Sequence, residues 1–111
     1  MFAVKAVLTP PDVTAATKLS HARQLTSLAR NLLSTSPSAV AHVTLRHTLA
    51  GLTAMLFVEA RHLRAAETLA RDACHSWLGE ERLRGWSLAR CEGDLFLTVE
   101  AANEYGSPPG W

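Results

Sequence analysis

The chain has 111 residues, 48% of them hydrophobic, which suits one domain with its own core and leaves no room for two. This composition excludes a disordered chain, and no apolar run approaches the roughly 18 residues of a membrane span. Eleven basic and ten acidic residues give a net charge of +1, which does not favour phosphate binding by the chain as a whole but leaves room for a local basic patch. The N-terminal segment lacks signal-peptide features, so we expect a cytoplasmic protein.

The N-terminal third is predicted to form one strand and one long helix. The apolar run Phe2–Leu8 ends at a turn signal, which favours a short strand. Thr9–Asp12 has the pattern of a helix start, with Thr9 as the cap and Asp12 completing a capping box. Apolar residues then recur every three or four positions through Val13–Leu33, so we expect a single helix that ends at the Ser- and Pro-containing segment 34–38.

The segment 40–60 is predicted to form a β-hairpin. His42–Arg46 alternates polar and apolar residues, Leu52–Glu59 forms the second strand, and Ala50-Gly51 is the expected two-residue turn. This turn fixes a register in which each apolar set stays on one face. The expected pairs are Leu45 with Leu56, Val43 with Val58, Arg46 with Met55, Thr44 with Phe57, and His42 with Glu59.

The second predicted helix covers Arg61–Leu78. Gly79 follows its last apolar residue, where a left-handed glycine often ends a helix. Small residues dominate one stripe of this helix and should let it approach a sheet closely. That stripe consists of Leu63, Ala66, Ala70, Ala73 and Trp77.

Two further short strands are expected near the C-terminus, Trp86–Cys91 and Leu95–Val99, around a turn at 92–94. Residues 1–102 are predicted to form a single α+β domain, and residues 103–111, rich in Gly and Pro, a flexible tail. The element order resembles the ferredoxin-like βαββαβ plan, with an extra C-terminal strand. That resemblance implies a two-layer sandwich in which two helices cover one face of an antiparallel sheet.

In this plan the other face of the sheet is open, and the predicted register places a mixed set of side chains on it. Thr44, Arg46, Met55 and Phe57 are the candidate binding or interface residues. Because exposed apolar patches usually mark a partner or ligand surface, we expect a homodimer formed through this face, with another protein or a small ligand as alternative occupants. A covering by the first helix or by the tail is the other alternative.

The sequence holds a few candidates for chemistry but no recognisable motif. His42 opposite Glu59, with Arg46 nearby, is a candidate catalytic group, because a carboxylate beside an imidazole favours general base catalysis. Cross-strand charged pairs are also routine on sheets, so a structural role is favoured. Cys74, His75 and Cys91 match no zinc spacing, so we expect two reduced thiols and neither a metal nor a cofactor.

Three functional hypotheses follow. The favoured one is a small binding or interaction module that self-associates through its open sheet. The alternative is a small cofactor-independent enzyme that resembles the dimeric α/β-barrel proteins, in which two such sheets enclose a pocket. The third, a nucleic-acid-binding module, has the least support: only Phe57 is an aromatic residue on the open central face, and the arginines are spread singly along the chain.

Overall fold

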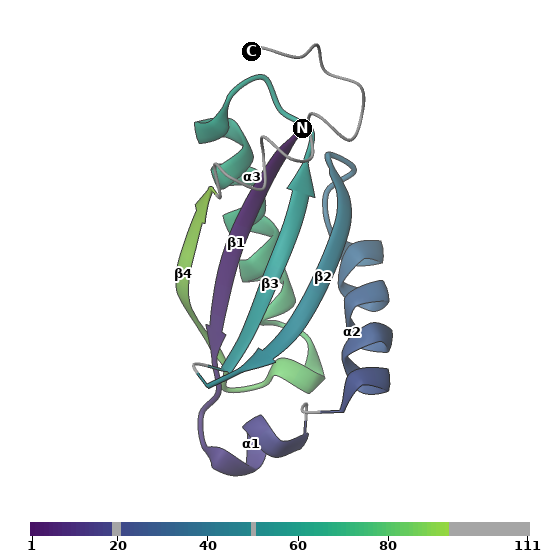
Figure 1. The fold of residues 1–111 in the computed structure, drawn as a ribbon, viewed down its shortest axis with the longest axis vertical. Coiled ribbons are helices and arrows are strands. Elements are labelled where there is room, and N and C mark those ends of the chain that lie inside the picture. Colours follow the sequence, from purple (N-terminus) through teal and green to yellow (C-terminus); the bar gives the residue numbers. More distant parts are fainter. Residues whose placement is uncertain (19–20, 50, 94–111) are drawn as a thin grey trace.

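The structure is a computed structural model that describes residues 1–18, 21–49 and 51–93. It is an α+β fold in which four strands form one antiparallel sheet of order β2-β3-β1-β4 (Figure 1). No helix in these ranges has both the length and the apolar character to cross a membrane. The elements are β1 (Phe2–Thr9), α1 (Val13–Lys18), α2 (Ala22–Thr35), β2 (Val40–Thr48), β3 (Gly51–Val58), α3 (Leu63–Trp77), the 3-10 helix η1 (Glu81–Leu83) and β4 (Ser87–Gly93).

The long helix predicted over 13–33 is wrong, because two helices occupy this segment. α1 ends at Lys18, and His21, in extended conformation, precedes α2. The cap of α1 is Asp12 and not Thr9, since the Oδ1 atom of Asp12 accepts a hydrogen bond from the N–H of Ala15 at 2.8 Å. The apolar repeat runs in phase through both helices, but α1 has no buried residue, whereas α2 buries one full stripe. Only α2 therefore has a packing reason to continue as a helix.

The predicted hairpin is confirmed, but its register is wrong by two residues. β3 already begins at Gly51, which pairs with Thr48, so Gly51 is a strand residue and not part of the turn. Gly51 has a φ of 128°, and a Cβ there would collide with the carbonyl oxygen of Leu8 on β1 and with the ring of Pro10. Only a glycine fits at this position of β3, because β1 lies too close for a side chain. Since a shift of two preserves the alternation of side chains, each residue keeps its predicted face.

The core lies between the helices and one face of the sheet, which we call the covered face. Trp77 of α3 is fully buried, and its Nε1–H donates to the carbonyl oxygen of Leu32 (3.2 Å) and to Oγ of Ser36 (2.9 Å) at the end of α2. The alanines of the predicted α3 stripe are also fully buried, so the close approach of this helix to the sheet is confirmed. The fully buried sheet residues of this face are Val4, Ala6, Leu8, Leu52, Ala54, Leu56 and Val58.

Two expectations about chain ends also change. Gly79 is not left-handed; α3 ends in tight turns, with the N–H of Gly79 bonded to the carbonyl of Ser76 and that of Glu80 to Trp77. β4 runs to Gly93, so Glu92 and Gly93 are strand residues and do not start a turn. The predicted strand 95–99 and the tail 103–111 lie outside the described residues.

Candidate functional site

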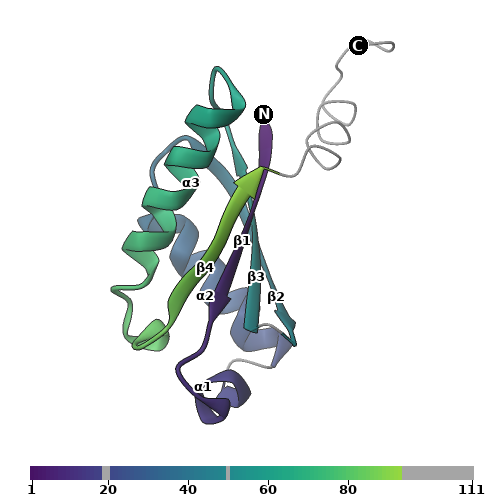
Figure 2. The ribbon, with the colours of Figure 1, turned by 90° about the vertical axis from the view of Figure 1, so that its left-hand side faces the viewer.

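The second face of the sheet is the one that α2 and α3 do not cover; Figure 2 shows α3 along one side of the sheet. We call this second face the open face. Strand registers place its residues in rows across all four strands. Its described members are Ala3, Lys5, Val7, His42, Thr44, Arg46, Thr53, Met55, Phe57, Arg90 and Glu92.

The open face has an apolar centre on the two inner strands. Met55 and Phe57 of β3 are half-buried, and Val7 of β1 is buried, with 9% of its surface exposed. Met55 lies between Thr44 on β2 and Lys5 on β1. The structure therefore brings together, on one surface, all four of the interface residues expected from the sequence, even though their predicted pairing was wrong.

The expected pairing of His42 with Glu59 is not formed. His42 lies opposite Phe57, with ring centroids 6.1 Å apart and planes inclined by 43°. Glu59 follows the end of β3, where its N–H donates to the carbonyl oxygen of Ala39. Within the described ranges the ion pair found is Arg90–Glu92 at 4.0 Å, so His42 has no carboxylate partner. The shift in register removes the carboxylate on which the catalytic hypothesis depended.

The two cysteines, treated as separate residues in the sequence, are neighbours in the fold. Cys74 on α3 is buried, and Cys91 on β4 is half-buried, with its thiol directed at the carbonyl of Glu67 (3.9 Å). A hydrogen bond between the two thiols, together with burial, raises the pKa of Cys74 far above its ordinary value. The same hydrogen bond and the charge of Arg71 lower the pKa of Cys91. Cys91 is therefore the thiol that ionises first.

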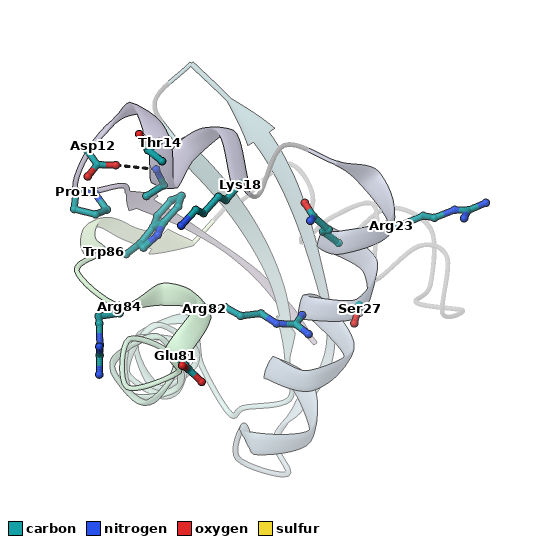
Figure 3. Close-up of a pocket in the computed structure, with 12 residues that line it drawn as sticks. Pro11, Asp12, Thr14, Lys18, Arg23, Ser27, Glu81, Arg82, Arg84 and Trp86 are labelled. Carbon is teal, nitrogen blue, oxygen red and sulfur yellow. Dashed lines mark hydrogen bonds between the residues drawn. The ribbon is translucent and has the colours of Figure 1, made fainter.

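A second candidate site lies at the end of the sheet where α1, α2 and η1 meet (Figure 3). It is an open cleft of about 920 Å³, which we call the basic cleft. Sequence analysis missed it because its residues come from segments more than fifty positions apart. Its lining is Pro11, Asp12, Thr14, Ala15, Lys18, Arg23, Gln24, Ser27, Glu81, Arg82, Arg84 and Trp86.

Comparison with known proteins adds no assignment to either surface. No family model, no curated protein and no solved structure matches the chain. In residues 1–18, 21–49 and 51–93 no three His, Cys, Asp or Glu side chains are grouped so that they could hold a metal ion. The functional conclusion must therefore come from the geometry of the two surfaces.

Proposed function

We propose that this protein is a small binding module that self-associates into a homodimer through its open face. The observation that carries the proposal is the apolar pair Met55 and Phe57, which keep part of their surface exposed on a sheet whose helices pack against the opposite side. Apolar side chains in contact with water are a favourable surface for association, because burying them removes that contact.

The layout of the chain supports a ferredoxin-like sandwich as the frame of this module. α2 connects β1 to β2 across β3, and α3 connects β3 to β4 across β1. Both crossovers use the same side of the sheet, since α2 and α3 contribute to one core. This layout supports the interleaved βαββαβ arrangement, in which the helices occupy one face of the sheet.

A second copy of the chain is the partner that the charges of the open face favour. Lys5 lies opposite Glu92 in the register of β1 and β4, and Glu92 also pairs with Arg90. A twofold axis brings each surface patch against its own copy, so a patch that holds both signs of charge can be self-complementary. Another protein or a small ligand on this face is the competing outcome.

The test is the mass of the protein in solution, measured by light scattering after size-exclusion chromatography. We expect twice the 12.0 kDa of one chain at micromolar concentration and a shift toward one chain for Phe57→Asp. Val13→Asp is the matched control, because Val13 is 82% exposed on α1 and is not part of the open face. A wild-type mass of 12.0 kDa would overturn the proposal.

A second candidate is the cofactor-independent enzyme with a pocket between two facing sheets. It is favoured by His42 and Arg46, which lie on the rim of the open face beside an apolar centre. The two candidates differ in the dimer interface: a binding module fills it, whereas an enzyme leaves a cavity of some hundreds of Å³. A crystal structure of the dimer decides between them. Nucleic-acid binding has less support, because Phe57 is the one Phe, Tyr or Trp on the described open face.

A further inference from the structure

The basic cleft is separate from the proposed dimer surface, since none of its lining residues belongs to the open face. α1, α2 and η1 form its walls, and these elements are brought together only by the fold. Ligand sites are commonly concave and of some hundreds of Å³, so a space of about 920 Å³ is large enough for a small organic molecule.

Four basic and two acidic side chains line the cleft, and of the four basic ones Arg23 and Arg84 extend away from its centre (Figure 3). Asp12 is engaged as the cap of α1, and Glu81 points away from α1 and α2 (Figure 3). Lys18 lies beside Trp86, and Arg82 reaches from η1 toward Ser27 on α2 (Figure 3). Neither cation belongs to an ion pair among the described residues, where the pair found is Arg90–Glu92.

The start of α2 adds a further positive contribution. His21 makes no side-chain capping bond, and the first turn of the helix has no acidic residue but contains Arg23. The first N–H groups of a helix lack intrahelical partners and carry partial positive charge, which an anion stabilises. Gln24 and Ser27, in the first and second turns of the helix, line the cleft with polar side chains.

We propose that the basic cleft binds a small phosphate ester, with its phosphate held by Arg82 beside Ser27 of α2. A guanidinium fork matches phosphate geometry, and the ammonium of Lys18 on α1 adds positive charge to the same cleft. Pro11, Ala15 and Trp86 give the cleft an apolar part, which suits the organic portion of an ester and would be left unused by a bare phosphate ion.

The test is isothermal titration calorimetry of the whole chain at low salt with three probes: adenosine monophosphate, inorganic phosphate and adenosine. We expect saturable one-to-one binding of the monophosphate, weaker binding of phosphate, and none of adenosine. Affinity should fall as salt rises, because the contact is between charges. Absence of saturable monophosphate binding at millimolar concentration overturns the proposal, as does equal binding of adenosine. If inorganic phosphate binds as tightly as adenosine monophosphate, the organic part of the ester contributes nothing, and the proposal of an ester ligand is overturned.

Arg82 in η1 and Arg84 directly after it supply matched variants. Arg82→Gln should weaken monophosphate binding by about tenfold or more, the size expected for a lost charge-assisted hydrogen bond, and Lys18→Gln should weaken it less, by about threefold, because it removes only a charge from the cleft. Arg84→Gln should change it less than about twofold, since Arg84 points away from α1 and α2 (Figure 3). Equal weakening by all three variants would indicate diffuse surface charge and overturn the site. Phe57→Asp should bind like the wild type, so failure of the dimer and failure of this site remain distinguishable.

Discussion

The two faces of the sheet belong to the same strands and differ in what lies over them. On the covered face Val4, Leu56 and their neighbours are fully buried beneath α2 and α3. On the open face Lys5 is exposed, and Met55 and Phe57 are half-buried. Adjacent residues of β3 thus differ in burial: Leu56 of the covered face is fully buried, whereas Met55 and Phe57 of the open face keep part of their surface exposed.

The largest effect is expected where the covered face is anchored by an aromatic residue. Trp77→Ala should lower the free energy of unfolding by about 3–5 kcal/mol, because it leaves a large cavity and removes the hydrogen bonds to Leu32 and Ser36. Trp77→Phe, which retains most of the apolar volume, should cost about 1–2 kcal/mol. Urea denaturation measures both. A loss below about 1 kcal/mol for the alanine variant would show that this helix face is not packed.

Two consecutive residues of β3 test the difference between the faces directly. Leu56→Ala should cost about 2–5 kcal/mol, because Leu56 is fully buried on the covered face. Phe57→Ala removes a larger side chain but should cost the single chain less, since Phe57 is only half-buried. Thermal melts at several protein concentrations separate the two effects: the loss for Phe57→Ala should grow with concentration if a dimer is removed, and that for Leu56→Ala should not. Equal losses of stability for Leu56→Ala and Phe57→Ala, independent of protein concentration, would contradict the expected difference between the two faces.

Overpacking the contact between α3 and the sheet should have a smaller effect. Ala70→Leu should destabilise the protein by about 1–3 kcal/mol, because Ala70 is fully buried and its extra atoms have no free space. Thr68→Leu on the exposed side of the same helix should change stability by less than about 0.5 kcal/mol. If chemical denaturation finds the two substitutions equivalent, the helix does not approach the sheet closely.

The smallest effect concerns the two thiols. Because the pKa of Cys91 is lowered by the thiol of Cys74 and by Arg71, iodoacetamide should modify Cys91 at lower pH than a cysteine of the unfolded chain. A lowered pKa in the folded state also means that ionisation of Cys91 stabilises the fold above the unfolded pKa, a contribution that is lost as pH falls.

Mass spectrometry across a pH series gives the pH at which the modification of Cys91 by iodoacetamide is half-maximal. Arg71→Gln should move the midpoint upward, whereas Arg64→Gln, at an exposed position on the same helix, should not. Cys74 should react last, because burial and its hydrogen bond raise its pKa. Modification of Cys74 before Cys91 would contradict the assignment.

The sequence by itself determined the first strand, the hairpin and the second long helix, and the face that each residue of the hairpin occupies. Alternation in β2 and β3 separates Val43 and Leu56 from Met55 and Phe57, and the alanine stripe of α3 requires a flat apolar partner. These patterns are local, since each depends on the geometry of a single strand or helix. They survive an error of two residues in the register.

Only the tertiary structure decided how these elements meet. The register depends on Gly51 approaching the carbonyl of Leu8, more than forty positions earlier in the chain. The division of the segment into α1 and α2 depends on which residues find a core to pack against. The contact of Cys74 with Cys91 and the cleft lined by α1, α2 and η1 likewise join distant segments. A periodic pattern predicts a helix or strand but not which elements pack against it. The sequence pattern therefore could not predict these sites.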